Sequence, residues 1–239
     1  MSMPPTPRLW LLGQCTLELG AEPVELCHNG QRLLAFMGLR GRVCRTVLAG
    51  TLWPEATEEH ARGSLRTALW KLPRTEPALI GRCGEALVVS PALRVDVHEL
   101  TSTALGVLKG CEPSVCEQPT LGDLTGDELL PGWDENWVLV ERERVRQLRL
   151  HALDALAEVL TRQGQTALAL EAAWASVRRE PLRESANRAV VSAHLAEGNV
   201  HEAIRHYQVF RRLLQEELGV EPTPLFSGML PVHRTDPCV

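Results

Sequence analysis

The sequence lacks any run of about 20 apolar residues, which is the length that a membrane-spanning helix needs. Even the leucine-rich stretch from Leu150 to Leu160 is interrupted by charged and polar residues. Residues 1–8 contain no apolar core followed by a small-residue cleavage site, so no secretory signal is visible. We therefore expect a cytoplasmic protein with no membrane partner.

The sequence also lacks a CxxC pair and a histidine pair at the spacing of metal ligands. Its seven cysteines are an odd number and lie scattered at positions 15, 27, 44, 83, 111, 116 and 238. This pattern argues against a zinc site and against a disulfide framework, so we interpret the cysteines as reduced thiols. His201 and His206 are five residues apart, which places them on different faces of a helix. We expect no bound metal.

Sequence motifs of common enzymes are missing as well. There is no GxxxxGKS or GxxxxGKT loop, no GxGxxG after a strand, no HExxH and no GxSxG. The usual nucleotide-binding, zinc-protease and hydrolase classes are therefore without support. We expect a protein that is not an enzyme and that uses no cofactor.

The charge of the chain is unevenly distributed. The 239 residues carry a net charge of −5, and 44% of them are hydrophobic, which is typical of a globular protein of two modest domains. Residues 31–74 hold eight basic and three acidic side chains, whereas residues 101–239 hold 14 basic and 20 acidic ones. This split suggests a DNA-facing module joined to a protein-facing one.

The first hundred residues predict strands, three helices and a hairpin, in that order. Short alternating runs between residues 8 and 26 predict two or three antiparallel strands. Helical spacing follows at 31–39, at 45–52 with Val47, Leu48 and Leu52 inward, and at 58–72 with Thr57 as the N-cap. Residues 79–89 predict a hairpin with Arg82 near its tip, and 93–97 a further strand. This order is that of a winged helix-turn-helix domain.

The third predicted helix carries the strongest functional signal. Ala61, Leu65, Ala68, Leu69 and Leu72 cluster on one of its faces. Arg66 lies on the opposite face, where an arginine suits a guanine edge in the major groove. Other cations flank this face at positions that suit phosphates. The predicted DNA-binding residues are Arg45, Arg62, Gly63, Ser64, Arg66, Thr67, Trp70, Lys71, Arg74 and Arg82. The competing interpretation is a solvated amphipathic helix whose Trp70 packs against the second domain.

The second half of the chain predicts a helical repeat. After a loop over residues 110–132, helical spacing covers 134–163, 165–179, 183–197 and 200–217. Gly164 and Gly198 are 34 residues apart, as are Ala169 and Ala203, and 34 is the period of tetratricopeptide helix pairs. The predicted fold is therefore an α+β winged helix-turn-helix domain, residues 8–97, followed by an all-α tetratricopeptide-like domain, residues 98–225, and a tail, residues 226–239.

Several motifs resemble the Streptomyces antibiotic regulatory protein family over roughly residues 8–225. They are Leu52-Trp53-Pro54, Ser64-Leu65-Arg66, Leu69-Trp70-Lys71-Leu72, Leu130-Pro131-Gly132-Trp133 and Leu218-Gly219-Val220-Glu221-Pro222. The resemblance implies an OmpR-like winged helix followed by a bacterial transcriptional activation domain. It further implies a pathway-specific activator of a secondary-metabolite (antibiotic) gene cluster, which binds direct repeats in promoter DNA, as a homodimer on DNA, and recruits RNA polymerase.

The resemblance also implies that the loop Pro54–His60 contacts the polymerase, through Glu55, Thr57, Glu58 and Glu59. Pro73 departs from the family pattern, because it shortens the third helix where relatives continue with basic residues. Two other classes of function stay open from the residues alone. One is a protein-interaction module whose winged helix does not read DNA, and the other is a regulator that binds a small molecule among the repeat helices.

Overall fold

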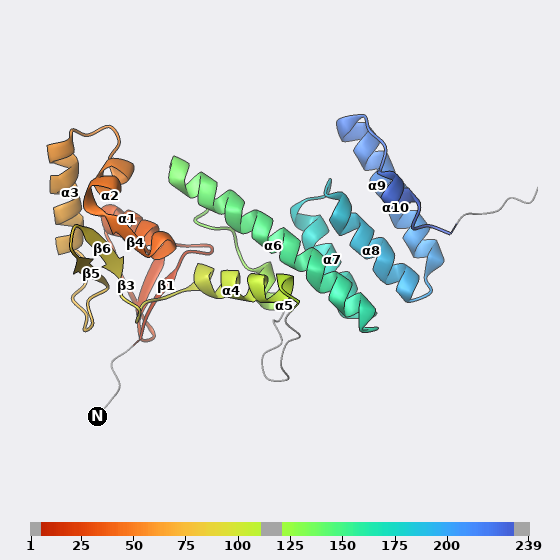
Figure 1. Cartoon of the computed structure of the whole chain (residues 1–239), viewed down its shortest axis with the longest axis horizontal. Coiled ribbons are helices and arrows are strands. Elements are labelled where there is room, and N and C mark those ends of the chain that lie inside the picture. The colour runs from red at the N-terminus through yellow and green to blue at the C-terminus, as the bar shows by residue number, and fades with distance from the viewer. Residues whose placement is uncertain (1–5, 111–120, 232–239) are drawn as a thin grey trace, which may run out of the picture. The chain divides into compact units, whose positions relative to one another are not determined.

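The computed structural model describes residues 6–110 and 121–231 (Figure 1). Contacts divide the chain into two compact units. The first takes residues up to Ser102 together with Gly126–Arg146, and the second takes Thr103–Thr125 and the residues from Gln147 onward. The sequence predicts a single cut at 97/98, whereas here residues 126–146 return to the first unit. None of the helices in the described ranges combines the length and apolar character that crossing a bilayer requires.

Two small sheets lie in the first unit. One has the order β3-β2-β1-β7, from β1 (Pro7–Trp10), β2 (Thr16–Leu19), β3 (Glu22–Val24) and β7 (Arg94–Val95). The predicted antiparallel strands are confirmed, and β7 adds a parallel pair to β1, with Leu9 opposite Val95. The other sheet has the order β4-β6-β5, from β4 (Arg42–Cys44), β5 (Ile80–Cys83) and β6 (Ala86–Val89). The pair β5 and β6 is the predicted hairpin.

Helix α1 (His28–Arg40) packs closely on the first sheet. Its buried residues include Leu33, Leu34 and Met37, and a Cβ built on Gly38 would lie 2.9 Å from Leu9 Cδ2, so that the Leu9 side chain would have to shift to admit a larger residue. The helix ends at Gly41, whose φ of +72° suits glycine and whose N–H donates to the Met37 carbonyl at 2.7 Å. The predicted end is confirmed.

Helix α2 (Arg45–Leu52) has the predicted bounds but not the predicted inner face. Leu48, Ala49 and Leu52 are buried, whereas Val47 is 57% exposed. Val47 lies about 100° around the helix from Leu48, and an eight-residue helix between two neighbours buries only a narrow stripe. The prediction that Val47 points inward is wrong.

A helix that the sequence analysis did not predict, α4 (Asp96–Leu108), begins directly after β7. The predicted strand over 93–97 is therefore only the two residues of β7. The Asp96 carboxylate is buried and accepts hydrogen bonds from the backbone N–H groups of Leu11, Leu12 and Val97 at 2.8–3.0 Å. Burial raises the pKa of Asp96 above its usual value, and the three amide donors oppose that rise.

Residues 126–146 complete the core of the first unit. Trp137 and Val138 of helix α6 (Asn136–Arg162) are buried there, and the Trp137 ring meets Phe36 edge-on at 5.1 Å between centroids. The Arg142 guanidinium donates to the carbonyls of Leu129, Leu130 and Trp133. The motif around Trp133 is thus held by the first turns of α6.

The second unit is helical, as predicted. Beyond the C-terminal part of α6 it contains α7 (Thr166–Arg179), α8 (Glu184–Ala196) and α9 (Val200–Leu218). Two short helices, α5 (Leu121–Thr125) and α10 (Pro224–Ser227), occupy stretches that the sequence assigns to a loop and to the edge of the tail. Phe226 of α10 is fully buried beside Phe210, so the boundary predicted at 225/226 falls inside a packed helix.

The 34-residue period appears as repeated geometry. Gly164 and Gly198 both have positive φ, +75° and +82°. The N–H that follows each glycine reaches back to the same relative carbonyl, Gln165 to Leu160 and Asn199 to His194, at 2.9 Å in both cases. Ala169 and Ala203 are both fully buried. The structure thus contains two equivalent helix-pair turns.

His206 on α9 is a titratable side chain inside this repeat. Its ring lies edge-on to Trp174 at 5.1 Å between centroids, and its Nε2 lies 3.0 Å from Asn187 Oδ1. Asn187 Oδ1 is the acceptor, because the amide nitrogen of Asn187 already donates to two carbonyls. Burial lowers the pKa of His206 to about 4, and the neighbouring His194 contributes to the same effect.

Asp96→Asn should destabilise the first unit. Each carboxylate oxygen of Asp96 accepts hydrogen bonds from backbone N–H groups. In asparagine one of these oxygens is replaced by an NH2 group, which is itself a donor and would face a backbone N–H. We expect a loss of about 1–3 kcal/mol in the free energy of unfolding, measured by urea unfolding with tryptophan fluorescence. The control is Asp134→Asn, at an exposed position of the same unit. Equal stability of the two variants would contradict this role of Asp96.

His206→Gln should flatten the pH dependence of stability in acid. A histidine whose pKa falls from 6.5 to about 4 on folding binds its proton more readily in the unfolded chain, so stability drops as the pH falls through this window. Glutamine can still donate to Asn187 but does not titrate here. The measurement is the unfolding midpoint between these pH values. The control is His201→Gln, at a side chain that is 87% exposed. Identical slopes for wild type and H206Q would contradict the assignment.

Candidate nucleic-acid interface

Helix α3 (Glu58–Trp70) is the helix that the sequence singles out. Of the predicted inner face, Ala61, Leu65 and Ala68 are buried, whereas Leu69 and Leu72 are only half-buried. Thr57 is the N-cap, as predicted, and its Oγ1 accepts from the His60 N–H at 3.4 Å. The helix ends at Trp70 instead of the predicted Leu72. A proline disfavours the helical conformation of the residue before it. Because Leu72 precedes Pro73, the helix ends before Leu72.

The opposite face of α3 is open to solvent. Arg62, Arg66 and Thr67 are exposed, and Trp70 is 76% exposed. Between Arg62 and Trp70 the helix carries no acidic residue. A Cβ built on Gly63 would meet no heavy atom within 4 Å, so packing inside the protein does not require a glycine there. This face offers a cation, an indole and a bare stretch of backbone on three successive turns.

The side chains of this face differ in what they already bind. Arg62 forms an ion pair with Glu58 at 2.6 Å, one turn earlier on the same helix. Thr67 donates its hydroxyl to the Gly63 carbonyl at 3.0 Å, which leaves its methyl group and its oxygen lone pairs for other contacts. Arg66 forms no hydrogen bond or ion pair with any other described residue. Of the two arginines on this face, Arg66 is therefore the one whose guanidinium has all of its donors available.

The remaining predicted contacts come from other elements. Ser64 is half-buried on α3, and Lys71 and Arg74 are exposed just after the helix. Arg82 is exposed near the end of β5, one residue pair before the turn at Gly84 and Glu85, so its predicted place near the tip of the hairpin is confirmed. Arg45 is the first residue of α2 and is half-buried, with one guanidinium nitrogen enclosed and without a partner in the described chain.

Arg42 is an exposed cation that the predicted set leaves out. It begins β4, three residues before the start of α2, and pairs in register with Val88 of the hairpin. It forms no hydrogen bond or ion pair through its side chain within the described residues. Its place in the basic segment 31–74 was visible in the sequence, but its place beside the hairpin needed the sheet register.

The predicted polymerase-contact loop is exposed throughout. Glu55, Thr57, Glu58 and Glu59 all lie on the surface. Two of them have partners already, because Thr57 caps α3 and Glu58 pairs with Arg62. Glu55 and Glu59 are the carboxylates of this loop without a partner among the described residues.

The described residues contain no group of three or more histidine, cysteine or acidic side chains that could hold a metal ion. Four of the cysteines, Cys15, Cys27, Cys44 and Cys83, lie among the described residues, and all four are free thiols. Burial raises the pKa of Cys15 to about 12, and the nearby Asp96 adds to this effect, so that this thiol stays protonated.

Comparison with known proteins gives matches to bacterial regulators. The model of the bacterial transcriptional activator domain matches residues 117–229. The regulatory protein AfsR of Streptomyces griseus is 27% identical over 232 residues, which are 91% of this chain and 23% of AfsR. AfsR of Streptomyces coelicolor is 33% identical over 102 residues, which are 43% of this chain and 10% of that protein. The chain thus spans less than a quarter of the length of either relative.

A solved structure with the same fold is EmbR of Mycobacterium tuberculosis, determined in complex with a low affinity phosphopeptide. The TM-score is 0.73 at 18% identity, over 95% of this chain and 66% of EmbR. This likeness confirms the predicted fold class, a winged-helix unit with strands and helices followed by a helical unit.

Glu58→Gln should strengthen sequence-independent binding to DNA. The substitution releases Arg62 from its ion pair and removes one negative charge from the start of α3. We expect tighter binding to a scrambled duplex and a slope of log affinity against log salt that is steeper by up to about 0.9, one phosphate contact. Fluorescence anisotropy over a salt series measures both. The control, Glu22→Gln, removes an exposed charge from β3. Equal effects of the two variants on DNA binding would show that releasing Arg62 from Glu58 adds no phosphate contact.

Proposed function

We propose that this chain, which belongs to the Streptomyces antibiotic regulatory protein family of transcriptional activators, reads promoter DNA through the exposed face of α3. Such activators are regulators and not a class of enzymes. The observation that carries the proposal is the two-sided character of α3. One face consists of small and apolar residues and is buried. The other face presents Arg66, which has no partner among the described residues, and carries no acidic residue between Arg62 and Trp70.

Arg66 is the residue that reads a base. Its guanidinium is exposed and unpaired within the described chain, and arginine can donate two parallel hydrogen bonds to O6 and N7 of guanine in the major groove. Thr67 and Trp70 suit a different contact. Because the Thr67 hydroxyl donates to the backbone, its methyl group is what it offers outward, and a methyl group or an indole matches the methyl group of thymine. Gly63 lets the helix backbone approach the duplex.

The other cations suit the phosphates that border the groove. Lys71 and Arg74 follow α3, Arg82 projects from β5 and Arg42 from β4, and all four are exposed. Arg45 at the start of α2 and Ser64 complete the proposed set. Arg62 joins it once its pair with Glu58 opens. Phosphate contacts position the protein without reading sequence, so this group sets affinity and salt dependence, while Arg66 sets preference.

Activation requires a second partner besides DNA. The exposed loop between α2 and α3 suits RNA polymerase, with Glu55 and Glu59 as its free carboxylates. Binding to promoter direct repeats, association as a homodimer on DNA and control of an antibiotic gene cluster follow from the family resemblance and complete the proposal. The second unit, with its acidic balance and its helix-pair repeat, suits contact with proteins.

Arg66→Ala should remove sequence preference. We expect affinity for the preferred promoter fragment to fall by about 5–150-fold, the value of about 1–3 kcal/mol for one bidentate base contact. Binding to scrambled DNA should change much less. Lys71→Ala should weaken both duplexes equally and reduce the salt slope by about 0.9. Fluorescence anisotropy with fragments from the neighbouring genome, at several salt concentrations, measures these effects.

The control for charge is Arg178→Ala, at an exposed position of α7. If Arg66→Ala kept both affinity and preference, α3 would not be the reading helix. Weak binding of the wild-type protein to every fragment alike would favour the protein-interaction module instead.

A further inference from the structure

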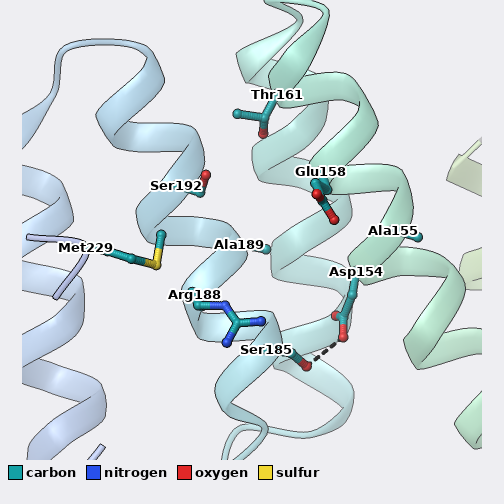
Figure 2. A pocket seen from close by; sticks show the side chains of 9 residues that line it. All are labelled: Asp154, Ala155, Glu158, Thr161, Ser185, Arg188, Ala189, Ser192 and Met229. Atoms are coloured by element: carbon teal, nitrogen blue, oxygen red, sulfur yellow. Dashed lines mark hydrogen bonds between the residues drawn. The ribbon is translucent and has the colours of Figure 1, made fainter. Parts of the chain in front are cut away.

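A pocket of about 340 Å³ lies in the second unit between α6 and α8. Its α6 wall presents Asp154, Glu158 and Thr161, which are four and three residues apart and therefore share one face of the helix. Its α8 wall presents Ser185, Arg188 and Ser192 at similar spacing. Figure 2 shows the two rows facing each other, with Met229 closing one side. A volume of this size is within the range of small-molecule sites.

Asp154 is not free to bind a ligand. Its carboxylate accepts hydrogen bonds from Ser176 at 2.8 Å, Arg183 at 2.9 Å and Ser185 at 2.7 Å. The Arg183 ion pair neutralises its charge. Asp154 therefore holds α6, α7 and the start of α8 together, and its role is to shape the pocket.

Apart from Asp154, the charged side chains that line the pocket are Arg188 and Glu158. Both line the pocket, yet they do not pair with each other, and neither forms a hydrogen bond or an ion pair with any other described residue. Arg188 is half-buried, and a half-buried guanidinium without a partner carries a desolvation cost. Two other half-buried arginines are paired, Arg32 with Glu135 and Arg183 with Asp154, whereas half-buried Arg45 on α2 keeps one enclosed nitrogen without a partner in the described chain. The pocket thus presents a cation on one wall and an anion on the other, held apart.

From this arrangement we infer that the pocket between α6 and α8 binds a small zwitterion of the amino-acid or dipeptide class. The ligand's carboxylate accepts from the Arg188 guanidinium, and its ammonium group donates to Glu158. The hydroxyl of Ser192 adds a polar contact. The thioether of Met229 and the small side chains of Ala155 and Ala189 leave room for an aliphatic or aromatic substituent.

The charge pattern excludes other classes of ligand. A phosphate or another anion without a cationic group would meet the carboxylate of Glu158. A simple cation would meet the guanidinium of Arg188. A molecule that carries both charges satisfies both walls, and the gain is largest at Arg188, because a half-buried charge is stable when it is paired and hydrogen-bonded, whereas Glu158 is exposed. The inference concerns a site away from α3 and goes beyond the proposed function.

The test is isothermal titration calorimetry of the full chain with the twenty amino acids and a set of dipeptides as probes. We expect binding of at least one of them at submillimolar to millimolar concentration. Arg188→Gln and Glu158→Gln should each weaken that binding by about tenfold or more, as expected for a lost hydrogen bond to a charged group. N-acetylation of the probe should weaken binding to wild type and abolish the effect of Glu158→Gln.

Matched controls are Arg212→Gln on α9 and Glu171→Gln on α7, both at exposed positions outside the pocket. They should bind the probe as wild type does. Circular dichroism shows whether each variant is folded, and Arg188→Lys, which keeps the charge, should restore part of the affinity. Absence of binding by every probe would overturn the inference. Binding that both pocket variants retain would overturn it equally, since the ligand would then lie elsewhere.

Discussion

The buried carboxylate of Asp96 is the constraint on which the first unit depends. It receives the backbone N–H groups that follow β1 and the one that starts α4, so a single side chain joins the beginning of the unit to the point where the chain leaves it. Asp96 directly follows β7, so these hydrogen bonds lie at the end of the parallel pair of β7 with β1. Helix α1 packs on β1 at Gly38, and the rest of the winged helix is built on α1. An uncompensated carboxylate would not survive such burial, which is why three amides converge on it.

The outward face of α3 follows from that core. Small residues on the inner face, Ala61 and Ala68, let the helix lie close to its neighbours, and Leu65 anchors it. Polar and aromatic groups on the other face then have no intramolecular use except the pairs Arg62 with Glu58 and Thr67 with Gly63. What is left is Arg66, which is unpaired within the described chain and hydrated, and Trp70, whose exposed indole is the costly group in water; both suit the proposed contact with a duplex. Structure and proposed activity are thus two results of one amphipathic pattern.

Much of the fold could be predicted from the sequence, because most helices here have strong periodicity and clear ends. Gly41, Thr57 and Pro73 mark boundaries by local chemistry, and the glycines at 164 and 198 mark the repeat. Helix α4 was missed because residues 93–97 resemble one longer strand, whereas only Arg94 and Val95 pair with β1 and the helix begins at the next residue, Asp96. Val47 was misplaced because a short helix has several plausible inner faces. In the candidate site, the four-residue spacing of Glu58 and Arg62 is enough to suggest their ion pair. The hydrogen bond of the Thr67 hydroxyl needs the three-dimensional structure. So does the pocket between α6 and α8, because the residues of its two walls lie 24–38 positions apart in the sequence.

Dimethyl sulfate footprinting tests most directly whether α3 reads bases in the major groove. The reagent methylates guanine N7 in the major groove and adenine N3 in the minor groove, so one experiment distinguishes the two. The duplex would be one selected by the protein from a random pool. We predict that bound protein protects specific guanine N7 atoms, and that this protection disappears with Arg66→Ala while adenine N3 reactivity stays the same. Selection of no preferred sequence, or protection confined to adenine N3, would contradict it.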